Sequence, residues 1–266
     1  MLRARHPGVE VIDAGRNLGF AGGNNLALRS VFARKDSRVR YVLLLNPDTE
    51  VVGDAIPTLV RYLEEHTDVA VVGPQLRYPN GTVQSSRRRF PTSGSLFWES
   101  TPLEWRWPDN PWVRRYRCVD LPDDEEQTVE WLVGAALMVR RSAIERAGLL
   151  DAGFVMYSEE LEWQHRLRAC GRIVYLPAAE IIHHEGKSSA QVPTWRMITF
   201  HQSRLRYVRL RYGDRLATAL RVFLMAAYSV ELFIEGGKWL MGHRRDLRRQ
   251  RVIGYLAFLR AMVSGC

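Results

Sequence analysis

The pattern of apolar and polar positions predicts an alternation of strands and helices over most of the chain. Short apolar runs bounded by turn residues predict strands at residues 9–12, 41–45, 69–72, 173–176 and 179–183. Helical spacing of apolar residues predicts helices at residues 24–33, 57–66 and 159–169, the last ended by Gly171. Strands that alternate with helices are typical of an α/β domain with a mostly parallel sheet.

Residues 78–124 interrupt this alternation. They contain four tryptophans, several prolines and the run Arg87-Arg88-Arg89, and an acidic run follows at residues 123–126. We expect a long excursion over the active face of the domain, because loops of this length usually serve a function. The three arginines predict either a phosphate-binding element or a solvated charged surface.

The C-terminal part has a different pattern. Residues 216–241 are mostly apolar, but their longest uncharged stretch, residues 222–230, is far shorter than the about 18 residues that cross a bilayer. The polar residues fall on one half of a helical wheel, which predicts an amphipathic helix in the membrane interface or one packed on the catalytic domain. We therefore expect a domain at residues 1–195 and a helical, basic, membrane-associating tail at residues 196–266.

Composition narrows the classes of partner. The 266 residues are 46% hydrophobic, enough for a core, and carry a net charge of +9. This charge suits phosphate-bearing substrates or an anionic membrane surface, whereas no nucleic-acid motif supports a nucleic-acid partner. Cys118, Cys170 and Cys266 have neither zinc-ligand nor disulfide spacing, and the N-terminus lacks the apolar segment of a secretory signal. A reducing cytosol is the expected compartment.

Two segments carry the candidate chemistry. Residues 17–25, N-L-G-F-A-G-G-N-N, are rich in glycine and asparagine, so that their backbone amides can approach a phosphate closely. Residues 41–48 form an apolar strand that ends at Asn46-Pro47-Asp48. A buried strand that delivers a carboxylate to its C-terminal end is a common way to build a ligand site in an open α/β sheet.

In these two segments the chain resembles family 2 glycosyltransferases, in particular the rhamnosyltransferase-like branch. Residues 131–136 are similar to the family segment W-x-x-G-A, residues 156–162 to M-Y-x-E-D-x-D-L, and residues 182–189 to V-x-H-x-G-G-x-S. The motifs occur in family order. The resemblance implies a GT-A fold, a Rossmann-like α/β sheet flanked by helices, and a direct, inverting transfer of sugar from a nucleotide-sugar.

The resemblance also implies roles for individual residues. Asp48 and His183 take the positions that hold a divalent cation, Mg²⁺ or Mn²⁺, and Asn46 replaces the first acid of the family's D-x-D-type motif. Glu160 takes the position of the general base, with Glu159 beside it. Glu160 stands where Asp is usual, which moves the carboxylate one methylene from the backbone. Two adjacent acids are expected to raise the pKa of one of them, whereas Glu162 is expected to be structural.

The remaining implied contacts belong to the substrates. The donor side would consist of Asn17, Gly19, Asn24, Asn25, Asn46 and Lys187. The resemblance implies a dTDP- or UDP-sugar donor, rhamnose being the candidate sugar. The acceptor would be a cell-envelope saccharide or a polyprenyl-diphosphate-linked saccharide at the cytoplasmic face of the membrane.

Family members normally begin with a strand that leads to V-D-N-x-S-x-D, and we expect this chain to lack that nucleotide-binding unit of about 35 to 40 residues. Such a chain would be a fragment, the product of a misassigned start, or an inactive remnant that binds nucleotide weakly. The sequence is also compatible with a nucleotidyltransferase, which would use a free sugar phosphate. A basic membrane-associated scaffold is a third class of function, and its liposome binding would not depend on Asp48.

Overall fold

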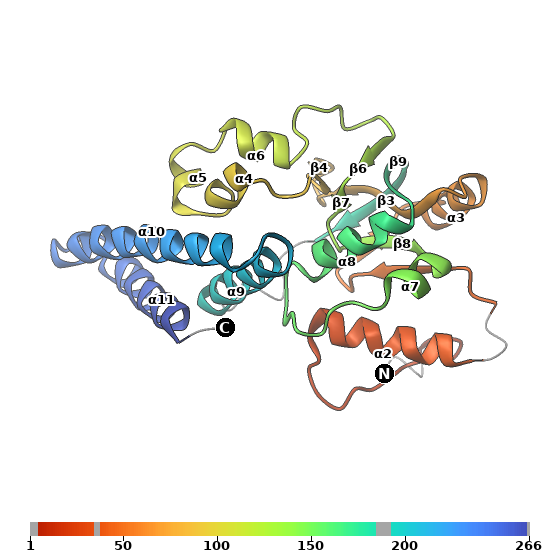
Figure 1. Cartoon of the computed structure of the whole chain (residues 1–266), viewed down its shortest axis with the longest axis horizontal. Coiled ribbons are helices and arrows are strands. Elements are labelled where there is room, and N and C mark those ends of the chain that lie inside the picture. Colours follow the sequence, from red (N-terminus) through yellow and green to blue (C-terminus); the bar gives the residue numbers. More distant parts are fainter. Residues whose placement is uncertain (1–4, 35–37, 185–192, 265–266) are drawn as a thin grey trace.

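The computed structural model describes residues 5–34, 38–184 and 193–264. A mixed sheet flanked by helices occupies one end of the molecule, and three long helices form the other (Figure 1). In chain order the elements are α2 (Gly19–Ala33), β1 (Tyr41–Leu45), β2 (Thr49–Val51), α3 (Ala55–Glu65), β3 (Val69–Arg77), β4 (Val83–Gln84), β5 (Arg87–Arg88), α4 (Ser93–Trp98), α5 (Pro102–Arg106), α6 (Pro111–Tyr116), β6 (Gln127–Val129), β7 (Trp131–Leu132), β8 (Ala136–Arg140), α7 (Arg141–Ala147), α8 (Glu159–Leu167), η1 (Arg168–Cys170), β9 (Arg172–His183), α9 (Pro193–Tyr212), α10 (Asp214–Leu240) and α11 (Arg245–Val263).

The main sheet has the order β1-β8-β3-β9-β2, with β4 added to β3 and β6 added to β9. The α/β class is confirmed, but the expectation of mostly parallel pairing is corrected. Strands β1, β3 and β9 point the same way, yet β8 runs in the opposite direction between β1 and β3 and makes both of its pairings antiparallel. Only β3 and β9 pair in parallel among the described strands.

Side chains alternate between the two faces of the sheet, and both faces carry apolar residues. Helices therefore cover both faces. On β3, Val71 packs with α2, α7 and α8 on one face, whereas Val72 packs with α3 on the other. Leu59 and Leu63 of α3 are fully buried, and burial of such a side chain contributes about 1.5–3 kcal/mol. The strands therefore read as continuous apolar runs, as expected for a sheet covered on both sides.

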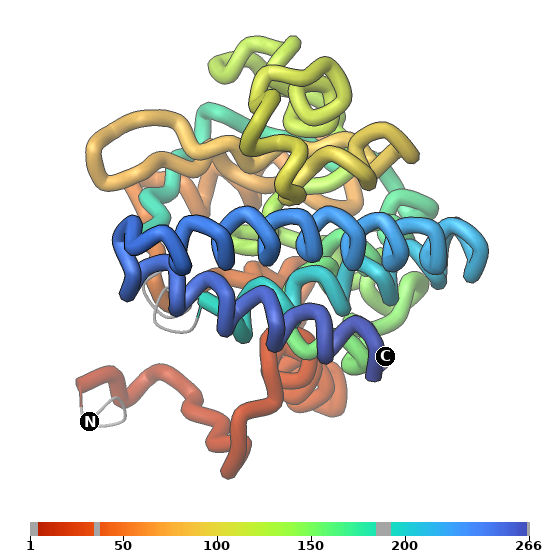
Figure 2. Tube along the Cα trace, turned by 90° about the vertical axis from the view of Figure 1, so that its left-hand side faces the viewer, coloured from red at the N-terminus to blue at the C-terminus, as the bar shows by residue number. Residues whose placement is uncertain are grey.

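A third core joins the long helices to the sheet domain. It contains Leu205, Leu220 and Phe258 from α9, α10 and α11, together with Leu96 of α4 and Leu161 of α8. Helices α10 and α11 lie side by side across one face of the molecule (Figure 2). The predicted boundary at residue 195 falls at the start of α9, but residues on both sides of it share this core. The division into two domains stays a prediction.

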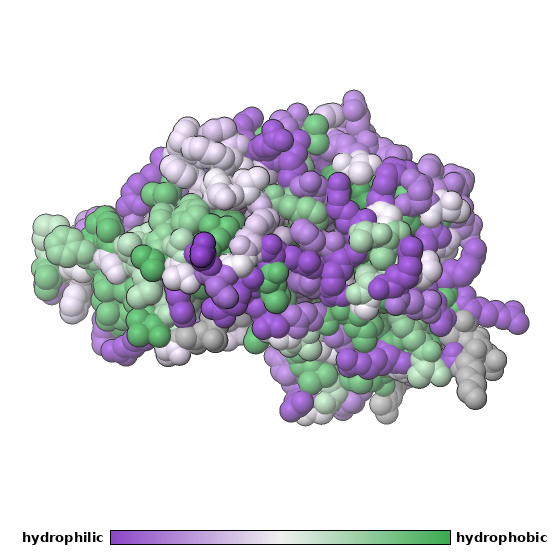
Figure 3. Space-filling model, viewed as in Figure 1, coloured by the Kyte–Doolittle hydropathy of each residue, from purple (hydrophilic) through white to green (hydrophobic). Residues whose placement is uncertain are grey.

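The acidic side chains on the polar half of α10 do not face solvent. Glu231 pairs with Arg106 of α5, and Glu235 pairs with Arg248 of α11, so these acids face other helices. Exposed apolar side chains remain on the outside of α10 and α11, and we call them the apolar face: Val222, Val230, Phe233, Leu240, Met241, Leu247, Ile253, Leu256 and Val263. Figure 3 shows hydrophobic side chains gathered over these helices.

Three further predictions are corrected. Residues 9–12 form no strand, and Val9 is 61% exposed, because these residues pair with no described strand. The helix expected from residue 24 begins at Gly19, so most of the glycine-rich segment is helical rather than a loop. Residues 78–124 contain short strands and helices, each helix started by a local cap such as Thr92, whose side chain accepts from the Ser95 N–H.

Candidate active site

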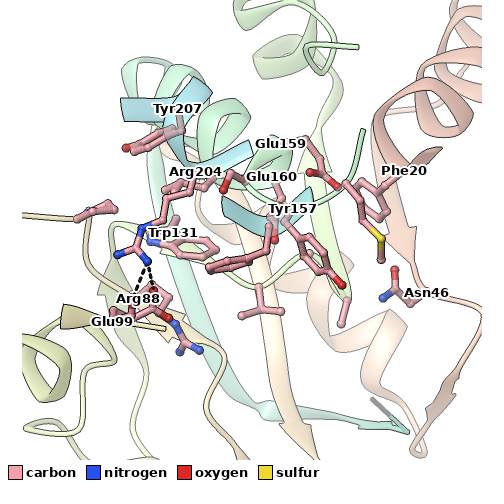
Figure 4. A pocket seen from close by; sticks show the side chains of 18 of the residues that line it. Phe20, Asn46, Arg88, Glu99, Trp131, Tyr157, Glu159, Glu160, Arg204 and Tyr207 are labelled. Atoms are coloured by element: carbon pink, nitrogen blue, oxygen red, sulfur yellow. Dashed lines mark hydrogen bonds and ion pairs between the residues drawn. The ribbon is translucent and has the colours of Figure 1, made fainter. Parts of the chain in front are cut away.

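A pocket of about 500 Å³ opens beside the C-terminal ends of β1 and β9. Its walls come from the turn between β1 and β2, the turn between β7 and β8, the N-terminus of α8, and helices α4 and α9 (Figure 4). The pocket brings together five of the residues predicted from the sequence, namely Asn46, Asp48, Glu159, Glu160 and His183. An opening at the carboxyl ends of sheet strands is the usual place for a ligand in this class of fold.

Strand pairing places Asp48 against His183. Strand β2 pairs antiparallel with the end of β9, which puts Thr49 opposite His183. The carbonyl of Asp48 also accepts a hydrogen bond from the His184 N–H at 2.9 Å. As a result, Asp48 Oδ1 lies 3.4 Å from His183 Nε2. His184 is turned the other way, toward Glu50, so only the first histidine of the pair belongs to the pocket.

The orientation of His183 makes this pair suitable for a cation. Its Nδ1 lies 2.9 Å from Gln84 Oε1, and this contact holds the ring with Nε2 toward Asp48. A neutral imidazole and a carboxylate can both ligate a divalent cation, so these two residues fit such an ion.

The protein supplies few further ligands. The described residues contain no cluster of three or more His, Cys, Asp or Glu side chains. Asn46 is held by its backbone, whose N–H donates to Ala135 O at 2.9 Å and whose carbonyl accepts from Thr49 Oγ1 at 2.7 Å, while the residue lines the pocket. A cation here would take its remaining ligands from water and from phosphate oxygens, as Mg²⁺ often does.

A strained turn presents the two acids at the start of α8. Tyr157 and Ser158 have φ angles of 71° and 64°, a left-handed conformation that costs about 1–2 kcal/mol for each such residue. The turn is held from α9, because Ser203 Oγ donates to Met156 O at 2.7 Å and the Tyr157 ring packs edge-on against Phe200. Strain of this kind is common at functional sites.

Burial makes both acids hard to ionise. Desolvation, with the neighbouring Glu160 carboxylate, raises the pKa of Glu159 to about 8. Desolvation also raises the pKa of Glu160, although the backbone amides of Glu160, Leu161 and Gly134 favour its charged form. Oε2 of each side chain has no hydrogen-bond partner among the described residues. Unpaired carboxylate atoms that face a pocket are well placed to accept a proton from a substrate.

Gly134 makes room for Glu160. A Cβ atom at this position would lie 3.2 Å from both Cβ and Cγ of Glu160 and 3.5 Å from the Phe20 ring. Residues 131–136, which resemble the W-x-x-G-A segment, divide between the core and the pocket. Leu132 is buried in the core, whereas Val133 and Gly134 line the pocket.

The predicted donor residues of the first motif do not line the pocket. Asn25 is fully buried, and its amide group exchanges two hydrogen bonds with the backbone of Leu150, so its assignment to the donor is corrected. Asn17 accepts from the Gly19 N–H, and a Cβ at Gly19 would lie 2.4 Å from Val155 O. Asn24 donates to Phe20 O. These contacts stabilise the N-terminus of α2 and pack the helix against Leu150 and Val155. Lys187 lies outside the described residues.

The three consecutive arginines have different roles. Arg87 is buried and contacts Asp123, Pro122 O and Gln127, while Arg89 forms a two-pronged pair with Asp120 at 2.7 and 2.8 Å. Both fasten the segment at residues 120–127 to the sheet domain. Only Arg88 lines the pocket. Glu162 is structural, as predicted, because it pairs with Arg166 and Arg211.

Sequence reasoning missed several residues of the pocket. Arg204 of α9 is buried and donates to the carbonyls of Ser95, Leu96 and Glu99, thereby tying α9 to α4 along one wall. Phe20, Tyr157 and Tyr207 add aromatic surface. Arg204 stands in a tail whose pattern indicated a separate helical unit, and no sequence signal connected it with the motifs.

Comparisons with known proteins identify the family of the chain. The sequence profile of glycosyl transferase family 2 matches residues 1–148. The N-acetylglucosaminyl-diphospho-decaprenol L-rhamnosyltransferase of Mycobacterium tuberculosis is 30% identical over 244 residues, which cover 85% of this chain and 78% of the relative. Rhamnosyltransferase WbbL of Escherichia coli (strain K12) is 27% identical over 222 residues, which cover 80% of each chain.

Solved structures give a weaker likeness. GalNAc-T7 with UDP, GalNAc and Mn²⁺ has a TM-score of 0.49 at 14% identity, covering 78% of this chain and 37% of that one. Mannosyltransferase PcManGT from Pyrobaculum calidifontis, in complex with GDP-Man and Mn²⁺, has a TM-score of 0.49 at 15% identity, with coverages of 98% and 70%. The assignment rests on the sequence comparisons: the chain belongs to glycosyl transferase family 2 and is a rhamnosyltransferase-like, nucleotide-sugar-dependent glycosyltransferase.

Proposed function

We propose that this protein transfers a sugar, rhamnose being the first candidate, from a nucleotide-diphosphate donor to a lipid-linked saccharide with inversion at the anomeric carbon. The observation that carries the proposal is the meeting of Asp48, His183 and Glu160 in one pocket. These residues come from three separate motifs of a family 2 chain, and they combine a candidate cation site with a candidate base.

In this reaction, Asp48 and His183 would hold Mg²⁺ or Mn²⁺, which would neutralise the charge of the departing nucleoside diphosphate. Gln84 orients the His183 ring so that Nε2 faces Asp48. Glu160 accepts the proton of the acceptor hydroxyl as that oxygen bonds to the anomeric carbon. Glu159 shares the negative charge of the pair with Glu160.

The substrate class is inferred from the relatives. The Mycobacterium tuberculosis protein is named for transfer of L-rhamnose to an N-acetylglucosaminyl-diphospho-decaprenol acceptor. We extend a dTDP- or UDP-sugar donor and a polyprenyl-diphosphate-linked saccharide acceptor to this chain. Such an acceptor is anchored in a membrane by its lipid, so the enzyme must work at a bilayer surface. We place it at the cytoplasmic face of the plasma membrane.

The apolar face of α10 and α11 is the proposed contact with that bilayer. Phe233, Leu240 and Met241 are 83%, 76% and 78% exposed, and single exposed residues of this kind are normal whereas a contiguous group marks a contact surface. Arg244, Arg245, Arg249 and Arg251 are exposed on the same helix pair. Arginines beside an apolar surface suit an interface with anionic lipids.

We propose an interfacial position for α10 rather than a transmembrane one. By length and composition alone α10 is sufficient to cross a membrane, and 28% of its most apolar window is buried in the structure. Glu231 and Glu235, however, pair with arginines of α5 and α11. Insertion across a bilayer would separate these pairs and expose charged groups to hydrocarbon, at a cost of several kcal/mol.

Calorimetric titration with dTDP, UDP and GDP, in the presence and absence of Mn²⁺, tests the donor site. We expect one nucleotide to bind only with the metal, and we expect Asp48→Ala to lose that metal-dependent binding while staying folded. Asp54→Ala removes an exposed carboxylate outside the pocket and serves as the matched control. A folded protein that binds none of the nucleotides would overturn the proposal and favour an inactive remnant.

A further inference from the structure

Arg88 lines the pocket without an ion pair. Its neighbours Arg87 and Arg89, and Arg204 on the pocket wall, each have a carboxylate within ion-pair distance, whereas no described carboxylate lies that close to Arg88. Its Nη1 donates to neutral oxygens, Ser85 Oγ at 2.9 Å and Arg87 O at 2.7 Å. Glu99 and Glu160 interact with it through space and not by a hydrogen bond, so the guanidinium keeps donors for an anionic ligand.

The surroundings of Arg88 fix its direction. It stands on β5, which pairs with β7, and its guanidinium lies over the Tyr116 ring with 5.9 Å to the ring centroid. Both arginine neighbours along the chain are fastened to residues 120–127, so the strand that carries Arg88 is held on either side. Burial lowers the pKa of Arg88, although Tyr116 and Glu99 act in the opposite direction. The guanidinium is thus preorganised rather than free to search the solvent.

Arg88 lies across the pocket from Asn46. In Figure 4, Asn46 is at the right of the view and Arg88 at the left, beside Glu99, with Glu160 above and between them. The donor's diphosphate belongs with Asp48 and His183, next to Asn46. A second anionic group near Arg88 would therefore belong to the molecule whose hydroxyl Glu160 deprotonates.

We propose that Arg88 binds the diphosphate that joins the acceptor saccharide to its lipid. This inference rests on the proposed function, because it assumes that Glu160 separates a donor side from an acceptor side. The planar guanidinium can contact two phosphate oxygens at once, which an ammonium group cannot do with the same geometry. The contact would let the enzyme select a lipid-diphosphate saccharide over a neutral glycoside of the same sugar.

Two acceptors distinguish this role from a general effect on the reaction. One is N-acetylglucosaminyl diphosphate on a short prenyl chain, and the other is an alkyl N-acetylglucosaminide without phosphate. We expect Arg88→Gln to weaken equilibrium binding of the diphosphate acceptor about 10- to 100-fold, the range for a lost charge-assisted hydrogen bond. Binding of the neutral glycoside and of the donor nucleotide should change less than about twofold, since neither contacts Arg88. Arg88→Lys should recover part of the loss.

Arg114→Gln is the matched control, because it removes one positive charge from α6 outside the pocket. Equal weakening of both acceptors by Arg88→Gln would assign Arg88 to folding and overturn the inference. Weaker donor binding would assign the arginine to the donor's diphosphate instead, which also overturns it. Because binding is measured without turnover, a wild-type protein that binds the diphosphate acceptor through Arg88 but transfers no sugar would refute the proposed reaction and leave this site standing.

Discussion

At the scale of single residues, the adjacent acids Glu159 and Glu160 define the chemistry that the pocket can perform. Both are buried, and their charges repel, so the pair holds a proton under conditions where isolated carboxyl groups would be ionised. A base with a raised pKa accepts a proton from a hydroxyl more readily than an ordinary carboxylate does. The pair therefore serves deprotonation of an acceptor better than it would serve as a permanent anion.

Glu160→Gln should abolish this step while leaving the donor site intact. The substitution keeps the shape of the side chain but removes the proton-accepting oxygen, so we expect kcat to fall about 10²- to 10⁴-fold. Nucleotide affinity, measured by calorimetry, should stay within about twofold. Glu162→Gln, which alters an ion pair with Arg166 and Arg211 outside the pocket, is the comparison. An unchanged kcat in Glu160→Gln would remove this residue from the mechanism.

The coupled pair also predicts a pH dependence. Transfer requires an ionised base, so kcat/KM should rise as the pH increases through the apparent pKa values of the pair. The charge of Glu160 raises the pKa of Glu159, so the two groups lose their protons in separate steps. In Glu159→Gln only Glu160 titrates, so the rising limb should contain a single ionisation. A rising limb with two ionisations in this variant would contradict the coupling.

The same shift affects stability with a definite sign. The folded protein keeps a proton on Glu159 between the ordinary pKa of 4.5 and about 8, whereas the unfolded chain has lost it. Stability therefore falls as the pH rises through this window. Relative to wild type, Glu159→Gln should be more stable at pH 8 than at pH 5, by up to a few kcal/mol. Urea unfolding at both pH values measures the difference.

Residue types alone separated functional from structural side chains only in part. Asp48 stands where an apolar strand ends, which is visible in the sequence, whereas His183 and Glu160 were predicted from the resemblance to the family motifs; all three line one pocket. Asn25 and Arg87 belong to equally suggestive runs, yet their polar atoms are satisfied by backbone and side-chain partners distant in the chain. Such long-range hydrogen bonds leave no local pattern that would predict them.

At the scale of elements, the N-terminus of α8 and the turn between β7 and β8 meet at Gly134. Gly134→Ala would place a methyl group 3.2 Å from Cβ and Cγ of Glu160, tighter than ordinary contact, and would displace the carboxylate. We expect kcat to fall about 10- to 100-fold, since misplacement by about 1 Å costs this much. The melting temperature should change little, because the displaced side chain borders the pocket. Kinetics and thermal unfolding together test this expectation.

Gly23→Ala tests a glycine with open space around it, in contrast to the crowded Gly134. A Cβ at Gly23 would meet nothing within 4 Å, and the residue lies inside α2. Alanine favours a helix over glycine, so this variant should gain about 0.5–1 kcal/mol of stability with unchanged kcat. If both glycine variants lost activity to the same extent, the loss would reflect a general disturbance of the fold rather than displacement of Glu160.

The predictability of each element depended on its length and on the origin of its stability. The strand at residues 41–45 was identified from its continuous apolar run, and the helix near residues 57–66 from apolar positions at helical spacing. The helices of residues 78–124 are short and depend on caps and ion pairs rather than on periodic burial, so their sequence resembled a loop. The direction of β8 depends on tertiary packing, which its own residues do not encode.

At the scale of the whole molecule, the long helices join the pocket to the apolar face. Helix α9 contributes Phe200, Arg204 and Tyr207 to the pocket, while α10 and α11 pack on α9 and expose the apolar face. A lipid-linked acceptor requires both a pocket for its saccharide and a surface that meets the membrane. Because α9 shares a core with the sheet domain, deletion of the tail would disrupt the pocket as well and cannot isolate membrane binding.

Point substitutions on the apolar face isolate it instead. Phe233→Asp and Met241→Asp remove exposed apolar surface without touching the buried pairs of Glu231 and Glu235. We expect the double variant to lose flotation with liposomes that contain anionic lipid, and to keep its nucleotide affinity and melting temperature. Val119→Asp, at an exposed apolar residue away from α10 and α11, is the control that introduces a comparable charge.

The dependence of vesicle binding on salt distinguishes a membrane from a second copy of the chain as the partner of the apolar face. Binding to anionic vesicles should weaken as salt increases, because arginines beside the apolar face contribute about 1 kcal/mol each at the surface and are screened by ions. Phe233→Asp/Met241→Asp should remove the remaining, salt-resistant part, which comes from apolar burial. If wild type ignores vesicles but forms a dimer that the double variant cannot form, the face binds a second copy of the chain. Sedimentation of both proteins without lipid would reveal that outcome, and the membrane proposal would then be wrong.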